Sequence, residues 1–339
     1  MTYPESKEIS DLVRNANKIL VVQADNPDGD SLGSALALEQ ILHEMGKEPI
    51  LFCGIDIPSY LHHMNGWDRV ERSIEQDFDL SIIVDTSSIS LLDSLEKSKQ
   101  IEFLKKKPCI VLDHHATEIS IPFATVACNK IAVATGEVIY EIAKDLDWPL
   151  NALAKERLAS SILSDSLGLM TEGTTARSIY IIAELVEHGV SLASLEDARR
   201  DLMRKTPELL SYKGQLLQRV EFHKNNQIAT ITIPWEEIEK YSHQYNPSML
   251  VIDDMRLVEG TDLAIAFKIY KDGKITAKIR SNFGITIAGE LAERFGGGGH
   301  SYASGFKIEA SQHKLLEELK IECIEVALDL LKKVKENDA

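Results

Sequence analysis

Aspartate and histidine residues gather in four short segments of the first half of the chain. These segments are Asn26-Pro27-Asp28-Gly29-Asp30, Asp85, Asp113-His114-His115 and Asp165. The first three follow short apolar runs, and the fourth comes at the end of a stretch with helical spacing. Carboxylates combined with imidazole are the ligands that Mn, Fe or Zn takes in preference to calcium. Together the four segments indicate a site for divalent metal ions.

Short apolar runs alternate with helical periodicity in this half of the chain. The apolar runs are 19–23, 49–52, 80–84, 109–112 and, more weakly, 123–127, and the helical stretches are 31–45, 136–146 and 152–163. Continuous apolar strands that alternate with helices predict a parallel sheet covered on both faces. We therefore expect a doubly wound α/β domain. Ligands of such sheets gather at the carboxyl ends of the strands, where the acidic segments fall.

Each segment taken alone also has a purely structural interpretation. Asn-Pro-Asp-Gly favours a turn, and Asp30 or Ser31 could cap the helix that follows. A single Asp after a strand is more often a turn residue than a ligand, and His114-His115 could be a solvated pair. Four such segments in one strand–loop–helix pattern are harder to obtain by chance. Carboxylates at one rim would repel each other unless cations were bound, and a pair of metal ions about 3.5–4 Å apart suits phosphoester hydrolysis.

After residue 174 the pattern changes. A helix is expected over 175–188, a charge-rich helical connection over 195–220 with Pro207 interrupting it, strands over 227–233, 263–270 and 274–280, and a last helix over 312–333. The last two strands form a hairpin at Asp272-Gly273. We expect three parts: residues 1–190 as the metal domain, 191–222 as a helical linker, and 223–339 as a smaller α/β domain with a mixed sheet.

Charge and cysteine content restrict the class of protein. The chain of 339 residues has 37 Lys+Arg and 53 Asp+Glu, a net charge of 37 − 53 = −16. This acidity argues against long nucleic acid, which needs clustered basic residues. No apolar run approaches the ~18 residues of a membrane span, and the N-terminus has no signal-peptide h-region. The four cysteines include no CxxC pair. A cytoplasmic protein that does not enter a membrane is expected.

A run of glycines, Gly296 to Gly299, precedes His300 in the second half of the chain. Glycines let a backbone approach a phosphate closely, and successive N–H groups can bind an anion. Arg280 and Ser281 end a hairpin strand just upstream. A flexible turn is the alternative, but we favour a substrate clamp. Its expected members are Arg280, Ser281, Gly297, Gly298, Gly299 and His300.

In this order, the motifs resemble those of the DHH phosphoesterases, a RecJ-like superfamily, and of their DHH-associated C-terminal domain. The resemblance covers nearly the whole chain and is greatest to the nanoRNase/pAp phosphatase branch. It implies that the active site lies in the cleft between the two domains. It also implies two Mn²⁺ ions, an attacking hydroxide activated by the metals, and small nucleotides as substrates: short oligoribonucleotides, 3′-phosphoadenosine 5′-phosphate, or cyclic or linear dinucleotides.

The resemblance assigns roles to individual residues. Asp30, Asp85, His114 and Asp165 would hold one manganese ion, and Asp28 and Asp85 the second, so that Asp85 bridges. His115 would contact the scissile phosphate, and Asp113 would orient an imidazole of the pair. The family usually has a ligand histidine where this chain has Ala24. The second metal site should therefore be weaker, or be completed by Asp25, Gln23 or water.

The leading hypothesis is a manganese-dependent phosphodiesterase or phosphatase acting on small nucleotides. The alternatives are an inorganic pyrophosphatase, a single-strand exonuclease of the same superfamily, or a nucleotide-binding protein with weakened catalysis, which Ala24 motivates. The partners expected are a small phosphorylated nucleotide or a short oligonucleotide, and neither long nucleic acid nor a membrane. A homodimer is compatible with the sequence.

Overall fold

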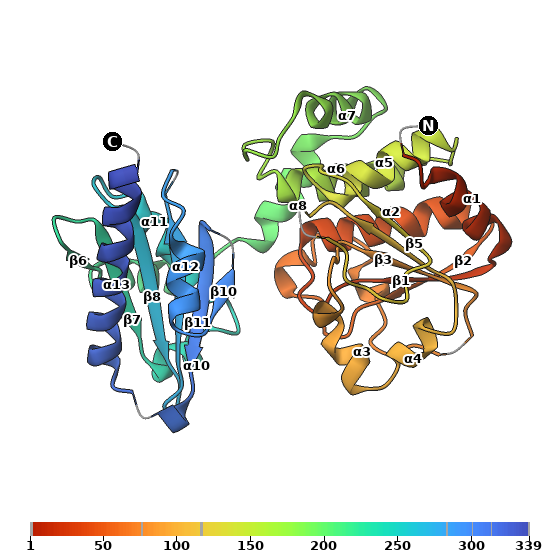
Figure 1. Cartoon of the computed structure of the whole chain (residues 1–339). Helices are drawn as coiled ribbons and strands as arrows, with labels where there is room; N and C mark the ends of the chain where they lie inside the picture. The colour runs from red at the N-terminus through yellow and green to blue at the C-terminus, as the bar shows by residue number, and fades with distance from the viewer. Residues whose placement is uncertain are drawn as a thin grey trace. The chain divides into compact units, whose positions relative to one another are not determined.

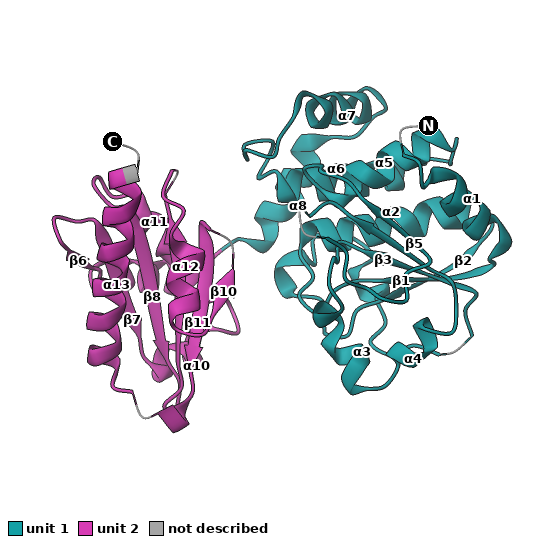
Figure 2. Cartoon of the chain, viewed as in Figure 1, with its two compact units in different colours: residues 1–204 teal, residues 205–339 magenta. Residues whose placement is uncertain are grey.

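The computed structural model describes residues 3–75, 77–115, 118–282, 284–299, 301–312 and 314–337. The chain forms two compact units, residues 1–204 and 205–339 (Figure 2). The boundary falls inside the segment 191–222, where we expected a linker. The functions expected of the separate domains remain predictions.

Five parallel strands form the sheet of unit 1. They are β1 (Lys18–Val22), β2 (Glu48–Phe52), β3 (Leu80–Val84), β4 (Cys109–Asp113) and β5 (Val126–Asn129). The strand order is β2-β1-β3-β4-β5, so the direction of the winding reverses at the β1/β3 neighbours. Side chains alternate between two apolar clusters: Val21 belongs to one and Val22 to the other. The predicted parallel α/β sheet is thus confirmed.

Helices cover both faces of this sheet (Figure 1). On one side pack α1 (Ser6–Asn15), α2 (Gly29–Glu44), α5 (Thr135–Asp145), α6 (Ala152–Asp165) and α7 (Ala176–Glu187); on the other lie α3 (Asp93–Lys97) and α4 (Ile101–Leu104). Unit 1 also contains α8 (Leu192–Leu202) and the 3-10 helices Ser59–Leu61, Trp67–Arg69 and Ile89–Leu92. The helices α2, α5 and α6 are central to the site because they end or begin at the same rim of the sheet.

Unit 2 has a six-stranded mixed sheet of order β10-β11-β9-β8-β7-β6, in which β7 and β8 pair in parallel. Its strands are β6 (Glu221–His223), β7 (Ile228–Ile233), β8 (Leu263–Ile269), β9 (Ile275–Ser281), β10 (Gly298–Gly299) and β11 (Ala303–Ile308). Its helices are α9 (Pro207–Leu217), α10 (Trp235–Tyr241), α11 (Ile252–Arg256), α12 (Ala288–Arg294) and α13 (Leu316–Asn337), with 3-10 turns at Pro247–Leu250 and Ala310–Gln312. The expected mixed sheet is confirmed.

Among the described residues, no single helix is long and apolar enough to cross a membrane. The pair α7 and α8 reaches that length and composition together, with a bend of 99° at the break between them.

The helices α2 and α6 pack closely because a glycine lies where they meet. A Cβ atom at Gly33 would lie 2.9 Å from the Cβ of Ser161 and 3.0 Å from the carbonyl oxygen of Arg157. The second of these atoms belongs to the backbone, so a side chain at this position would move α6 itself. Ser161 also hydrogen-bonds Asp30, which connects this packing to the rim of the sheet.

Substituting Gly33→Ala should therefore destabilise the protein by about 1–3 kcal/mol, because the added methyl group overpacks the α2/α6 contact. Urea denaturation of the full chain measures the change. Gly173→Ala is the control in the same unit, since its Cβ would be 3.9 Å from Val133 and fits without displacement. The control should change stability by less than about 0.5 kcal/mol. Equal stability of both variants would contradict the packing argument.

Candidate active site

The crevice between β1 and β3 is where the strand order reverses, and sheets of this kind bind ligands at that point. Asp30 follows β1 in the first turn of α2, and Asp85 follows β3 directly. Asp113 is the last residue of β4, with His114 next to it, and Asp165 is the last residue of α6. The fold therefore brings these segments to the carboxyl edge of the sheet, as predicted.

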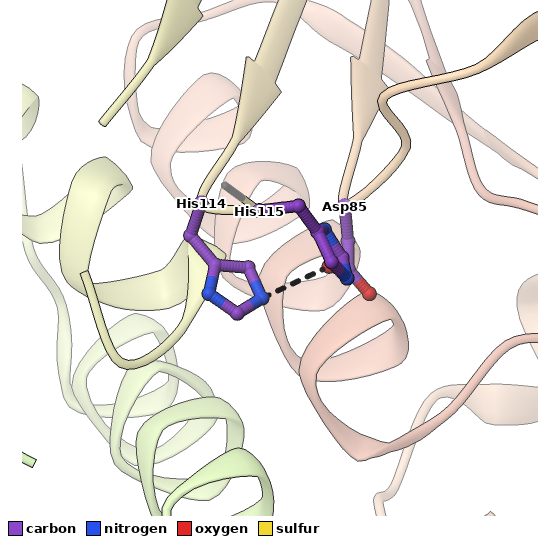
Figure 3. Close-up of side chains that lie close together, drawn as sticks. All are labelled: Asp85, His114 and His115. Atoms are coloured by element: carbon purple, nitrogen blue, oxygen red, sulfur yellow. Dashed lines mark ion pairs between the residues drawn. The ribbon is translucent and has the colours of Figure 1, made fainter. Parts of the chain in front are cut away.

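His114 lies at the centre of the acidic residues. Its Nε2 atom is 3.3 Å from Asp165 Oδ2, 3.5 Å from Asp30 Oδ2 and 3.5 Å from Asp85 Oδ1. His115 joins from the same turn, with Nδ1 3.7 Å from Asp85 Oδ1. Figure 3 shows both rings turned toward Asp85. Two overlapping groups result, Asp85–His114–His115 and Asp30–His114–Asp165, whose ligand atoms lie within 4.8 Å of each other.

The chemistry of these donors fits a divalent cation. His114 Nδ1 is 3.1 Å from the carbonyl oxygen of Ala132, which places the proton on Nδ1 in the neutral ring and leaves Nε2 as a ligand. Nε2 is buried and has no hydrogen-bond partner among the described residues. Ligands about 2.1 Å from one ion lie about 3–3.5 Å apart, and the three distances at His114 agree with that spacing.

Asp30 is fully buried, and four donors hold its carboxylate. Thr135 N and Gly136 N, at the start of α5, donate at 2.7 and 3.2 Å. The hydroxyls of Ser34 and Ser161 donate at 3.0 and 2.5 Å. Three of these bonds go to Oδ1, so Oδ2 remains directed toward His114. None of these donors was expected from the sequence, because Thr135, Gly136 and Ser161 come from the helices α5 and α6, far from Asp30 along the chain.

Burial and mutual repulsion raise the pKa values of the rim carboxylates in the absence of metal. Burial, followed by the charges of Asp30 and Asp28, raises the pKa of Asp165 to about 7. Burial and the charge of Asp30 also raise the pKa of Asp85. Burial alone would lower the pKa of His114, but its close contact with the carboxylate of Asp85 and the charges of the other carboxylates around it raise the pKa to about 10. A metal ion would replace these protons as the compensating charge.

The backbone conformation of Asp85 and a hydrogen bond between Asp113 and His115 position the other residues at the centre of the rim. Asp85 has a φ of 55°, a left-handed conformation that Asp and Asn tolerate better than most residues. Asp113 is fully buried, and its Oδ1 accepts a hydrogen bond from His115 Nδ1 at 2.8 Å. This bond raises the pKa of His115 and aims its other ring nitrogen away from Asp113. Asp113 therefore orients His115, whereas Ala132 orients His114.

The residues expected around the second metal are less closely gathered. Asp28 is exposed and belongs to neither metal-capable group; its Oδ1 caps α2 by accepting from Asp30 N and Ser31 N at 3.0 Å. Asp25 is engaged elsewhere, since Ser94 N donates to its Oδ2 at 2.6 Å and the Ser94 hydroxyl binds Oδ1. Gln23 is fully buried, and neither of its amide atoms has a partner in the described part of the chain.

The residues expected to bind substrate lie in unit 2. Arg280 and Ser281 end β9, with Arg280 half-buried and Ser281 buried. The Ser281 hydroxyl has no partner among the described residues. Gly297 precedes β10, and Gly298 and Gly299 form it, paired with β11. His300 was expected to belong to the same clamp and falls outside the described residues.

Packing within unit 2 explains two of these glycines without a ligand. A Cβ at Gly297 would lie 2.2 Å from the carbonyl oxygen of Gly305, and one at Gly299, where φ is 136°, would lie 2.7 Å from that of Ala303. Both positions therefore require glycine for the close approach of the loop to β11. At Gly298 a Cβ would meet nothing within 4 Å, so its backbone is open to a ligand.

Comparison with known proteins agrees with this fold. The DHH family, N-terminal domain, matches residues 18–174. A "Bifunctional oligoribonuclease and PAP phosphatase NrnA" of Thermus thermophilus is 27% identical over 281 residues, which span 83% of this chain and 81% of that protein. The protein of that name from Bacillus subtilis is 26% identical over 306 residues, covering 88% and 92%. The crystal structure of an exopolyphosphatase-related protein from Bacteroides fragilis superposes with a TM-score of 0.84 at 19% identity, covering 99% and 98%.

The chain thus has the DHH phosphoesterase fold, with a rim of Asp and His residues that can bind metal. Residues 18–174 match the N-terminal domain of the DHH family, and the class of protein that the site and the relatives indicate is that of the phosphoric ester hydrolases.

Metal binding should release protons, because His114 and part of Asp165 are protonated near neutral pH without metal. At pH 7.5 we expect about one proton released for each ion bound at the Asp30–His114–Asp165 group. The apparent affinity should rise about tenfold per pH unit up to about pH 10, where His114 has lost its proton. Isothermal titration calorimetry in buffers of different ionisation enthalpy counts the protons. Binding without proton release would contradict the assignment of His114 as a ligand.

Substituting Asp165→Asn should have opposite effects on the metal-free and metal-loaded protein. The folded-state pKa of Asp165 is raised from 3.8 to about 7, so its carboxyl costs stability that grows as the pH rises between these two values and is largest above about pH 7. The neutral amide should therefore stabilise the metal-free protein at pH 8 by about 1 kcal/mol, and by less at pH 5, where the wild-type carboxyl is protonated. The same substitution should abolish most of the stabilisation by added metal. Thermal melts with chelator and with metal measure both effects. Destabilisation of the metal-free protein at pH 8 would refute the repulsion argument.

Proposed function

We propose that this protein is a manganese-dependent phosphodiesterase or phosphatase that hydrolyses small nucleotides. The observation that carries the proposal is the pair of overlapping Asp/His groups that share His114 at the β1/β3 crevice. Carboxylates with imidazole suit Mn²⁺ among the available cations. The names of the relatives from Thermus thermophilus and Bacillus subtilis support oligoribonucleotides and pAp as the substrate class.

The residues of unit 1 divide the work of the reaction. Asp30, Asp85, His114 and Asp165 would hold one cation, and Asp28 with Asp85 a second, so Asp85 would serve both. When bound, the two cations would supply charge that polarises the phosphate and activates a water molecule for attack. His115 would donate a proton or a hydrogen bond to the phosphate, since its bond to Asp113 favours the protonated ring.

The second cation site is expected to be the weaker of the two. Ala24 provides no ligand, and the hydrogen bonds from Ser94 occupy the carboxylate of Asp25. Gln23 or water could still replace the ligand that Ala24 does not provide. Both amide atoms of Gln23 lack a hydrogen-bond partner in the described residues. We therefore propose that the second ion binds less tightly and exchanges with solvent.

In unit 2 we propose that Arg280, Ser281, the backbone of Gly298 and His300 bind the nucleotide, and that Gly297 and Gly299 permit the loop to adopt its shape. Arg280 suits a phosphate or the face of a base. All four cysteines of the chain are buried free thiols, which fits a reducing compartment such as the cytoplasm.

The test is hydrolysis of a pentaribonucleotide, pAp and a linear dinucleotide with Mn²⁺, comparing the wild type with Asp85→Asn. Asn tolerates the positive φ of Asp85 and keeps its shape, so the variant loses a charge without losing the fold. We expect at least a ~100-fold fall in kcat/KM, since this carboxylate would serve both cations. Asp56→Asn is the matched control, because Asp56 lies in a surface ion pair with Arg72.

Full activity of Asp85→Asn would contradict the proposed role of that residue. A wild-type protein that binds Mn²⁺ and nucleotides but hydrolyses none of the three substrates would contradict the enzymatic proposal, and would favour a nucleotide-binding protein instead.

A further inference from the structure

A cavity of about 260 Å³ lies between the helices α5, α6 and α7 of unit 1. It is lined by the last turns of α5 and α7, by the first turn of α6, and by residues 146–151, which connect α5 to α6. The three helices pack on the same face of the parallel sheet (Figure 1). None of the residues of the two metal-capable groups lines this cavity. It is therefore a separate candidate binding site.

The cavity lies at the ends of α5 and α6 that are far from the rim of the sheet. Thr135 begins α5 and donates to Asp30 at the rim, whereas Lys144, near the other end of α5, lines the cavity. Likewise, Asp165 ends α6 at the rim, and Lys155 lines the cavity from its first turn. Because α5 has 11 residues, about 16 Å separates its two ends. A ligand in the cavity would therefore not contact the proposed metal site.

Part of the cavity wall is apolar. Trp148 is buried, Leu185 at the end of α7 is buried, and Leu150 is half-buried. The backbone N–H of Trp148 donates to the carbonyl oxygen of Ala143 at 2.9 Å, which holds the connection against the end of α5. These side chains offer an apolar surface to the aliphatic part of a small ligand.

Two side chains of opposite charge line the same cavity without pairing. Lys155 is half-buried and Asp147 is exposed, and within the described part of the chain neither forms an ion pair or a side-chain hydrogen bond. By contrast, Lys144 and Glu184, which also line the cavity, pair with each other at 2.7 Å. An unpaired cation and an unpaired anion at one cavity are complementary to a ligand that carries both charges.

Two further donors lie at the wall. His188 Nδ1 is 2.7 Å from the carbonyl oxygen of Glu184, which leaves Nε2 for a ligand. The hydroxyl of Tyr140 is buried and makes no hydrogen bond with the described residues. Burial, and then the nearby carboxylate of Glu184, raise the pKa of Tyr140, so the hydroxyl keeps its proton. Together with the ammonium group of Lys155, these donors suit a carboxylate ligand.

We propose that this cavity binds a free amino acid with an aliphatic side chain. Its carboxylate would pair with Lys155, its ammonium group with Asp147, and its side chain would pack on Trp148 and Leu150. A volume of 260 Å³ lies below the roughly 300–1,000 Å³ of sites for drug-sized molecules, which fits a ligand as small as leucine. The inference does not depend on the proposed function, because it uses no residue of the metal rim.

The experiment is a ligand-observed NMR titration of L-leucine with the full chain in chelator. We expect saturable binding with a Kd of about 1 mM, since a ligand with so few atoms gains limited binding energy. Two analogues isolate the charges: 4-methylpentanoate lacks the ammonium group, and 3-methylbutylamine lacks the carboxylate. Each should bind about fivefold more weakly than leucine, because each loses one partly exposed ion pair.

Two variants assign the charges to residues. Lys155→Gln should weaken binding of leucine and 4-methylpentanoate about fivefold and leave 3-methylbutylamine unchanged. Asp147→Asn should weaken leucine and 3-methylbutylamine by a similar factor and leave 4-methylpentanoate unchanged. Asn tolerates the φ of 51° at Asp147, so the backbone is preserved. Lys106→Gln is the control, because Lys106 is exposed, lies outside the cavity and should affect none of the three ligands.

Absence of saturable leucine binding at about ten times the expected Kd would overturn the inference, as would equal affinity for leucine and both analogues. Equal effects of Lys155→Gln and Lys106→Gln would also overturn it, since they would indicate surface charge alone. Thermal melts check that each variant is folded. None of these outcomes bears on hydrolysis, so failure of the proposed function is observed separately, as absent hydrolysis by the wild type with Mn²⁺.

Discussion

Repulsion among buried carboxylates is the constraint on which unit 1 depends. Asp30 and Asp85 are both buried, and Asp165 adds a third charge around one imidazole. In water such carboxylates would stay apart, so the fold must supply compensation. It does so in part with four donors on Asp30 and with the protonated ring of His114. The raised pKa values of Asp85 and Asp165 show that this compensation is incomplete. A cation at the rim removes the remaining cost, which couples metal binding to the stability of the fold.

The same constraint explains why small residues line the helix contacts behind the rim. Asp30 can reach Ser161 only because Gly33 lets α2 and α6 approach closely. Gly136 has a similar function at the start of α5, where a Cβ would lie 2.0 Å from the Ser161 hydroxyl. These contacts bring the N-terminus of α5 to Asp30, so that backbone N–H groups and the helix dipole stabilise the carboxylate. Packing and electrostatics at this site therefore depend on each other. A shift of α5 or α6 would move the donors that stabilise the carboxylate of Asp30.

Local patterns predicted much of the fold and the acidic and His segments that meet at the rim of the sheet. Apolar runs such as 80–84 matched their strands because burial on both faces requires continuous apolar sequence. The strand expected over 123–127 is β5, Val126–Asn129, whose alternating burial gives a weaker signal, and α1, with only Ile9 and Val13 among its buried apolar residues, was not expected. Pro207, expected to interrupt a helix, begins α9 instead. The bonds that Asp30 accepts from Thr135, Gly136 and Ser161 could not be predicted, nor could the engagement of Asp25 by Ser94, because those contacts join residues 69 or more positions apart.

Charge distribution distinguishes the two units more clearly than total charge does. The net charge of −16 was an argument against long nucleic acid, yet β9 has two cations without acidic partners on an uncovered face of its sheet. Phosphate binding depends on local potential, because charges farther than about 10 Å away are largely screened at physiological salt. In unit 1, buried acids are concentrated at the rim of the sheet, where a cation can neutralise them.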